Sequence, residues 1–215
     1  MNAAEVTEYA NPTGTNPAGN WYEGRKVGEI WGYRASGIIQ TQEEADEYNS
    51  KYNLSYLSGT AWTPGDVKYI DLNNDGKIDR GDNNLNNMGD MTIIGNTTPR
   101  YQYTINGSIS WKDLSLSVMF QGVGKRDWDP GTAPYFWGSG AYAQVTVFNE
   151  HMDYWREDNK DAYYPKPYIH SAGGVGPFRN KIMQTSDRYL QSGAYCRLKN
   201  ITLSYNLPST WVQKA

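Results

Sequence analysis

Residues 100–124 read RYQYTINGSISWKDLSLSVMFQGVG, and this stretch decides the fold class. From Tyr101 to Trp111, aromatic and aliphatic side chains and one glycine fill the odd positions, while Gln, Thr, Asn and Ser fill the even ones. The alternation resumes from Leu114 to Phe120. A period of two residues indicates a strand with one apolar and one polar face. The sequence therefore predicts two consecutive strands that separate apolar from polar side chains.

Two dipeptides compete for the turn between these strands. Asn106-Gly107 is a strong hairpin signal, but a turn there would place Tyr103 beside Ser110. Paired residues share a face, so that register would mix apolar and polar side chains. A turn at 112–113 instead pairs like with like: Trp111 with Leu114, Ile109 with Leu116, Ile105 with Phe120, Ser110 with Ser115, and Ser108 with Ser117. Face matching therefore predicts the turn at 112–113.

The length of the first strand bears on its surroundings. The eleven residues of 101–111 would span about 37 Å, or about 26 Å along a membrane normal at a tilt of about 45°. The apolar band of an outer-membrane barrel is about 25 Å tall, whereas strands of globular proteins average about five or six residues. The fold class predicted is mainly β: antiparallel strands of a partial transmembrane β-barrel, with long loops and one or two short helices.

The alternation also predicts which side chains face lipid and which face the barrel lumen. The predicted lipid-facing residues are Tyr103, Ile105, Ile109, Leu116, Val118 and Phe120. The predicted lumen-facing residues are Thr104, Asn106, Ser108, Ser115 and Ser117. A third strand is predicted over 195–207, where Arg197 and Lys199 fall in phase with the apolar positions. Charge is costly at mid-depth, so we expect that end of the strand at or beyond the headgroups.

The remaining elements are short. A strand is predicted around Ile30–Tyr33 within residues 25–40, and residues 1–24 are expected to be loop or disordered. Thr41 and Glu44 fit a capping box, which predicts a short helix over 45–52. A second helix is expected over Gln144–Trp155.

Composition excludes several classes of protein. The chain has 215 residues, with 20 Lys and Arg against 23 Asp and Glu, a formal net charge of −3. This balance argues against a nucleic-acid partner. The mean hydropathy of −0.75 leaves no room for an apolar transmembrane helix. Since the first residues lack a secretion signal, we expect either a cytoplasmic protein or a piece of a longer chain.

Residues 71–82 (DLNNDGKIDRGD) fit the twelve-position loop of an EF-hand. Gly76 occupies position 6, where that loop turns sharply. The predicted Ca²⁺ ligands are the side chains of Asp71, Asn73, Asp75 and Asp79, the backbone carbonyl of Lys77 and, least well placed, Asp82. Asp82 stands where EF-hands carry a bidentate Glu, so we expect weak, structural binding. The alternative is an Asx-rich turn that bonds its own backbone.

No arrangement typical of catalysis accompanies this loop. His151 and His170 have no nucleophile nearby in the sequence, and Glu150 with Asp153 are typical of solvated charges. We therefore expect that the protein is not an enzyme.

Five segments together resemble the SusC/RagA family of TonB-linked outer-membrane proteins, and they occur in the family's order. They are 65–79 (GDVKYIDLNNDGKID), 93–101 (IIGNTTPRY), 114–122 (LSLSVMFQG), 154–159 (YWREDN) and 195–208 (YCRLKNITLSYNLP). The resemblance identifies residues 25–215 as a C-terminal portion of such a barrel, truncated at both ends and including the calcium-loop-like segment 71–82.

The resemblance also implies a function and partners. It implies import of oligosaccharides or peptides across the outer membrane of a Gram-negative cell, through a barrel embedded in outer-membrane lipid. The partners implied are the TonB complex, reached through the absent N-terminal part, and a SusD-like surface lipoprotein that closes the barrel. The alternative from the residues alone is a secreted soluble β-sandwich, a carbohydrate-binding module with a calcium loop.

Overall fold

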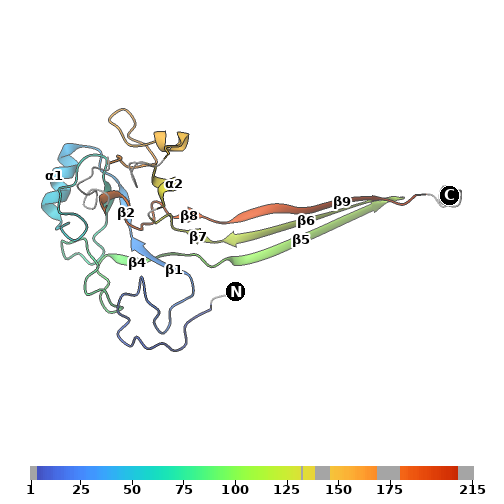
Figure 1. Cartoon of the computed structure of the whole chain (residues 1–215), viewed down its shortest axis with the longest axis horizontal. Coiled ribbons are helices and arrows are strands. Elements are labelled where there is room, and N and C mark those ends of the chain that lie inside the picture. The colour runs from blue at the N-terminus through green and yellow to red at the C-terminus, as the bar shows by residue number, and fades with distance from the viewer. Residues whose placement is uncertain (1–3, 132, 139–145, 169–179, 208–215) are drawn as a thin grey trace.

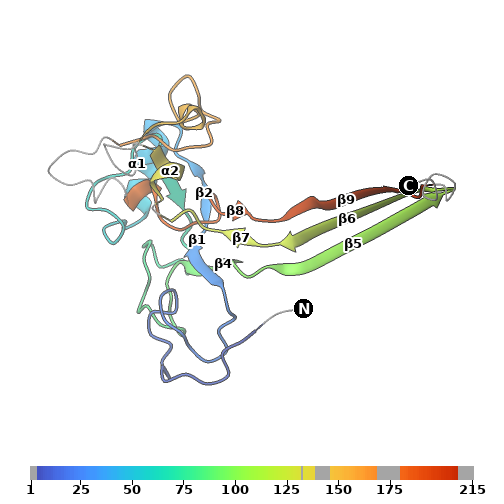
Figure 2. The same ribbon diagram turned by 45° about the vertical axis from the view of Figure 1, so that its right-hand side comes forward.

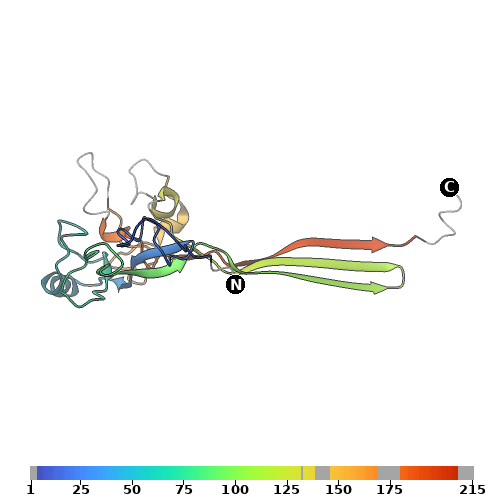
Figure 3. The ribbon, with the colours of Figure 1, turned by 90° about the horizontal axis from the view of Figure 1, so that it is seen from below.

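The computed structural model describes residues 4–131, 133–138, 146–168 and 180–207. A long three-stranded ribbon extends from a compact part that holds the short strands and helices (Figures 1 and 3). Within the described residues the strands form four small antiparallel sheets: β1-β4, β2-β3, β5-β6-β9 and β7-β8. The elements are β1 (Glu29–Tyr33), β2 (Ala35–Ile38), α1 (Gln42–Lys51), β3 (Val67–Tyr69), β4 (Met91–Asn96), β5 (Arg100–Trp111), β6 (Leu114–Lys125), β7 (Asp127–Trp128), α2 (Pro134–Trp137), the 3₁₀ helix η2 (Asn149–Met152), β8 (Gln191–Ser192) and β9 (Tyr195–Tyr205).

The predicted hairpin is confirmed in its register. β5 pairs with β6 antiparallel across the turn at 112–113, and Asn106 lies inside the strand opposite Met119. The paired residues include all five predicted pairs: Trp111 with Leu114, Ile109 with Leu116, Ile105 with Phe120, Ser110 with Ser115, and Ser108 with Ser117. Matching faces therefore outweighed the local turn preference of Asn106-Gly107.

The third strand, β9, pairs with β6 but departs from the predicted phase. Its register shifts between Met119 and Phe120, so that Leu198 pairs with Phe120 and Arg197 pairs with Gln121. A β-bulge inserts one extra residue into one strand and reverses the alternation beyond it. The placement of Arg197 in phase with the apolar positions was therefore wrong, because the bulge moves Arg197 to the polar face.

The ribbon continues into the compact part through short flanking strands. β4 precedes β5, β7 follows β6, and β8 precedes β9 (Figure 2). The Asp127 carboxylate at the start of β7 accepts a hydrogen bond from the amide of Asn96 at the end of β4, at 2.9 Å. β1 pairs antiparallel with β4.

The first predicted helix is confirmed, and its cap differs from the expected box in one bond. The Thr41 hydroxyl accepts from the Glu44 amide at 3.2 Å, which satisfies one free donor at the start of α1. The Glu44 carboxylate accepts from the amide of Gln40 at 2.7 Å, one residue before the cap. Tyr48 and Ala45 on the inner face of α1 are buried in the core.

The prediction of a second helix over Gln144–Trp155 was wrong for the described residues. They contain only the 3₁₀ turn η2 over 149–152, while 144–145 lie outside the described part. The amide of Trp155 bonds to the carbonyl of Tyr164 at 2.9 Å, and the Tyr164 amide bonds to the Asp153 carbonyl at 3.0 Å. The backbone groups of Asp153 and Trp155 that a helix would use are thus hydrogen-bonded to Tyr164 instead.

The hydrophobic core lies in the compact part rather than in the ribbon. Trp62, Ile39 and Ile78 are completely buried there, together with Tyr33 from β1 and Tyr69 from β3. Every residue of β9, and all of β5 after Arg100, is exposed. Both faces of the ribbon therefore remain open in this structure.

Candidate functional site

The ribbon sorts its side chains onto two chemically distinct faces. One face carries cross-strand rows of apolar residues: Ile105, Phe120 and Leu198; Ile109, Leu116 and Leu203; Trp111, Leu114 and Tyr205. The row of Gly107, Val118 and Ile201 continues this face. Ile109 and Leu203 are 68% and 67% exposed, which is unusual for aliphatic side chains gathered in one patch. Large exposed apolar patches mark contact with a protein or a membrane.

The opposite face of the ribbon is polar. Its rows are Thr104, Gln121 and Arg197; Asn106, Met119 and Asn200; Ser108, Ser117 and Thr202; Ser110, Ser115 and Ser204. The hydroxyls of Ser110 and Ser115 are 2.9 Å apart across β5 and β6. In these four rows Arg197 is the single charged side chain. The register confirms that the predicted residues divide between two faces; the surroundings of each face stay a prediction.

The first half of the calcium-like loop is organised by Asx turns. The Asp71 carboxylate accepts from the amides of Asn74 at 2.7 Å and Gly76 at 3.0 Å. Asn73 accepts from the amide of Asp75 at 3.1 Å, and Asp75 accepts from the amide of Lys77 at 2.9 Å. A carboxylate has about four acceptor positions, so these bonds leave capacity for a cation.

In the second half of the loop, one carboxylate bonds within the loop and another bonds to a residue beyond it. The Asp79 carboxylate accepts from the amide of Gly81 at 2.6 Å, and Asp82 accepts from the side chain of Asn87 at 3.0 Å. Gly76 adopts a φ of +77°, which favours glycine at the position where the EF-hand template requires it. Among the described residues no three His, Cys, Asp or Glu side chains come together as a metal-binding group. The Ca²⁺ ligand set therefore remains a prediction.

One carboxylate that sequence spacing missed holds this loop in place. Asp90 is 1% exposed and accepts from the amides of Leu72 at 2.7 Å and Asp79 at 2.9 Å, one near each end of the loop. Burial raises the pKa of Asp90, and the two amide bonds partly counter that rise. No pattern in the sequence singles out Asp90, because its role depends on contacts between its carboxylate and backbone amides that lie far from it in the sequence.

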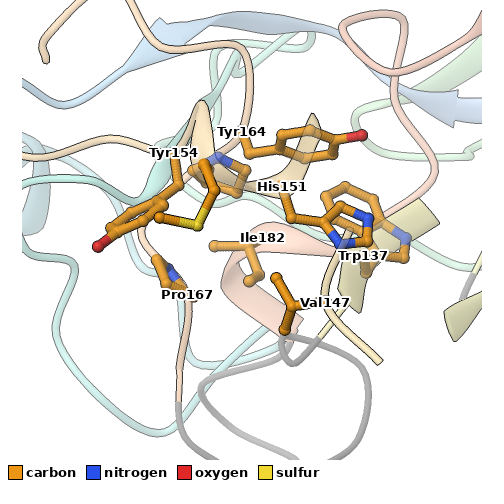
Figure 4. Close-up of a pocket in the computed structure, with 9 residues that line it drawn as sticks. Trp137, Val147, His151, Tyr154, Tyr164, Pro167 and Ile182 are labelled. Carbon is orange, nitrogen blue, oxygen red and sulfur yellow. The ribbon is translucent and has the colours of Figure 1, made fainter. Parts of the chain in front are cut away.

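An aromatic pocket lies between η2 and the segment around Tyr164. Its volume is about 250 Å³, and Figure 4 shows Trp137, His151, Tyr154 and Tyr164 around it, with Ile182 near its centre. His151 Nδ1 accepts from the amide of Phe148 at 3.1 Å, and its Nε2 lies 3.1 Å from the carbonyl of Tyr135. Backbone groups thus occupy both ring nitrogens, so His151 has no nitrogen free to act as a general base. His170 lies outside the described residues.

The helices carry no membrane signal. No helix in the described part of the chain is both long and apolar enough to span a membrane.

Comparison with known proteins gives two distant relatives. The chain is 28% identical over 193 residues to TonB-dependent receptor P3 of Formosa agariphila. It is 25% identical over 186 residues to TonB-dependent receptor P26 of the same organism. These alignments cover 89% and 86% of this chain but only 16% of each relative. No family model matches the chain. Over most of its length the chain is therefore distantly similar to a limited stretch of TonB-dependent receptors, which are transporters rather than enzymes.

Proposed function

We propose that this chain forms part of an outer-membrane TonB-dependent importer of the SusC/RagA type. In this proposal β5, β6 and β9 are neighbouring strands in the wall of a transmembrane β-barrel. The observation that carries the proposal is the register of the ribbon, which keeps one face apolar across all three strands. The distant similarity to two TonB-dependent receptors supports it independently.

The bulge in β9 strengthens the assignment of the apolar face to lipid. Without it, Arg197 would share a face with Leu203 and Ile201, where a charge at mid-depth is costly. The register shift instead pairs Arg197 with Gln121 on the polar face. In the proposed barrel the outer face is apolar, and Arg197 faces the water-filled lumen.

The free edges of the ribbon also fit a segment of a larger sheet. Among the described strands, β5 and β9 each pair with β6 alone, so each has one open edge. Backbone groups at membrane depth must be hydrogen-bonded, because lipid offers them no partner. We infer that strands contributed by the rest of a longer protein cover both edges.

Substrate and partners follow from the same proposal. Oligosaccharides or peptides would be the cargo, the TonB complex would supply energy, and a SusD-like lipoprotein would close the outer side. The resemblance of the five sequence segments supports these assignments. The polar face, lined by hydroxyl and amide groups, is chemically suited to passing hydrophilic solutes.

The test uses two neighbouring residues of β5 with opposite orientations. In a Cys196→Ser background, which removes the exposed native thiol, Ile109→Cys and Ser108→Cys are placed in the longest natural protein that contains this chain. In outer membranes, we expect an aqueous maleimide to label the thiol at 108 and to leave the thiol at 109 unlabelled. The reverse pattern would refute the assignment of the faces.

The same experiment evaluates the soluble β-sandwich alternative. A sandwich buries one face of each sheet against the other, whereas both faces of the β5-β6-β9 ribbon are exposed in the described residues. This exposure favours the barrel. Recovery of the protein without detergent, with the thiol at 109 still protected by a second sheet, would favour the secreted carbohydrate-binding module instead.

We further propose that the loop at 71–82 binds one structural Ca²⁺, with Asp71, Asn73, Asp75, the Lys77 carbonyl, Asp79 and Asp82 as ligands. Asx turns already fix the orientation of several side-chain oxygens in this short segment. Ca²⁺ would offset the repulsion among these carboxylates.

Calorimetry tests the calcium proposal. Because position 12 holds Asp82, we expect a dissociation constant of about 10⁻⁴ to 10⁻³ M. Asp75→Ala should abolish the heat of binding, whereas Asp113→Ala, in the turn between β5 and β6, should not change it. If no heat appears at millimolar calcium, or if Asp75→Ala binds like the native chain, the loop is an Asx-rich turn.

A further inference from the structure

The three strands of the ribbon carry positive charge only. Their charged residues are Arg100 in β5, Lys125 in β6, and Arg197 and Lys199 in β9, and none of the three strands contains Asp or Glu. Arg126 adds another cation directly after β6. The whole chain has a formal net charge of −3, so its acidic residues are concentrated outside these strands. The ribbon is therefore a cationic element of an acidic chain.

These cations lie in one half of the ribbon, next to the compact part. From the turn at 112–113 as far as the pair of Asn106 and Met119, the rows of the polar face contain only serine, threonine, asparagine and one methionine. All the cations of the strands lie beyond that pair, and Arg197 is the one that faces Gln121 across the polar face. Like charges gathered in one region add their potentials. This half of the ribbon is therefore the half that attracts anions.

A hollow of about 260 Å³ lies at the same end of the polar face. Most of its lining belongs to two polar rows, with Gln102 and Tyr195 in one and Thr104 and Gln121 in the next. Arg126 also lines it, and none of the described residues around it is Asp or Glu. Complete small-molecule sites have volumes of about 300–1,000 Å³, so this hollow fits one part of a larger solute. Its amides, hydroxyls and guanidinium offer hydrogen-bond donors without a carboxylate.

The side chain of Arg126 is held in place by its stem and by one nitrogen. Its Nε donates to the carbonyl of Thr97 at 3.1 Å. A Cβ added at Gly193 would lie 3.3 Å from the Arg126 Cδ, so the aliphatic stem packs against this glycine. The two terminal nitrogens form no hydrogen bond with another described residue. A guanidinium fixed in this way presents its remaining donors to a carboxylate, sulfate or phosphate.

No carboxylate in the described part of the chain neutralises the cations beside the hollow. The ion pairs there include neither Arg126 nor Arg197. Asp127, which is next to Arg126 in the sequence, accepts from the amide of Asn96 at 2.9 Å. The Arg197 guanidinium lies 5.1 Å from the centre of the Tyr195 ring, a contact that keeps it beside the hollow and leaves its charge available.

We propose that this hollow binds an anionic group of a solute, either a carboxylate, a sulfate or a phosphate, with Arg126 and Arg197 as its charged contacts. A planar guanidinium can bind two oxygens of any of these groups at once. Gln102, Thr104 and Gln121 supply neutral polar contacts around the charged group. The polar face lines the lumen in the proposed importer, so the cargo would be anionic; this consequence rests on the proposed function.

The experiment compares probes that differ in charge and share a skeleton. The longest natural protein that contains this chain is titrated in detergent by calorimetry with sucrose octasulfate and sucrose, and with tetraglutamate and tetraglutamine. We expect at least one anionic probe to bind about 10-fold or more tightly than its neutral counterpart at low salt, and high salt should reduce that difference. The two pairs distinguish a sulfated saccharide from an acidic peptide as the source of the charge.

Three variants locate the binding. Arg126→Gln and Arg197→Gln should each weaken binding of the anionic probe by about 3- to 10-fold and leave the neutral probe unaffected. Lys112→Gln removes the same charge in the turn between β5 and β6, at the far end of the ribbon. It should leave binding nearly unchanged, because solvent and salt screen a charge at that distance.

Several outcomes would overturn the proposal. They are equal binding of the anionic and neutral probes in both pairs, native affinity in both Arg126→Gln and Arg197→Gln, or an equal loss in Lys112→Gln. Failure of both anionic probes to bind would also overturn it, and would indicate that acidic residues from the rest of the protein occupy the hollow. The maleimide test reports only which face of the ribbon meets water, so the hollow and the importer can fail separately.

Discussion

Replacing Asp66 by Asn is expected to lower the free energy of unfolding by about 3–5 kcal/mol, because it removes the carboxylate charge that faces a buried lysine. Asp66 and Lys181 are 0% and 1% exposed, and the lysine Nζ lies 3.4 Å from the Asp66 Oδ2. Breaking such a pair costs more than the pair contributes, since the remaining charge is already desolvated.

The surroundings of the pair explain why neither group can relax into water. The Asp66 carboxylate accepts from the amide of Thr63 at 2.8 Å and from the hydroxyl of Tyr168. The Lys181 ammonium donates to the carbonyl of Ala61 and lies 5.4 Å from the ring of Trp62. Burial lowers the pKa of Lys181, and Asp66 partly restores it. In the variant, the lysine loses the interaction that favours its charged form.

The measurement is denaturant unfolding followed by tryptophan fluorescence, with an exposed ion pair as the control. Arg156 Nε lies 3.0 Å from Asp158 Oδ1, but the two side chains are 38% and 79% exposed. Solvent screens exposed ion pairs, so Asp158→Asn should leave the unfolding midpoint nearly unchanged. The double variant Asp66→Asn, Lys181→Met should cost less than Asp66→Asn alone. Equal losses from Asp66→Asn and Asp158→Asn would contradict the prediction.

The hairpin of β5 and β6 could be predicted because its information is local. Its strands are adjacent in the sequence, and each has a period-2 pattern that constrains the register. Only one turn position aligned both patterns, and the structure has that turn. The cap of α1 at Thr41 was predictable for the same reason, since all its bonds lie within four residues.

The phase of β9 could not be read in this way. The bulge opposite Met119 and Phe120 depends on the partner strand, which lies about 80 residues earlier in the chain. Read alone, the sequence places Arg197 and Lys199 among apolar positions. Only pairing with β6 shows that the alternation reverses between Leu198 and Asn200, which puts Arg197 on the polar face.

The buried polar groups were missed for a related reason. In the sequence Asp66 is only one residue of the segment 65–79, yet its partner Lys181 lies 115 positions further along the chain. Arg80 fell within the calcium-like loop, and its side chain interacts with Tyr33 from β1. A single sequence carries no signal for such long-range contacts between polar side chains.

The second large effect concerns charge on the two faces of β6. Val118→Lys is expected to destabilise the folded protein in lipid vesicles by about 2–4 kcal/mol, the cost of a cation facing lipid near the bilayer midplane. Ser117→Lys, one residue away, should have an effect close to zero. The two positions are adjacent in β6, so the difference between their free energies of unfolding reports only the face on which the charge lies.

The register supplies the reason for this contrast. Val118 lies between Gly107 and Ile201 on the apolar face, whereas Ser117 lies between Ser108 and Thr202 on the polar face. A lysine at 117 would extend into a hydrated lumen, but a lysine at 118 would have to desolvate or reach the headgroups from mid-strand. Urea unfolding of both variants of the longest natural protein, refolded into vesicles, measures the difference. If water reached both faces, as it does in the described ribbon, the two lysines would cost the same. Equal effects would thus refute the membrane assignment even if the variants fold. A large cost confined to position 118 means that the apolar face is covered, and recovery of the protein only with detergent then identifies the cover as lipid, because a second sheet packed on that face would give a soluble sandwich.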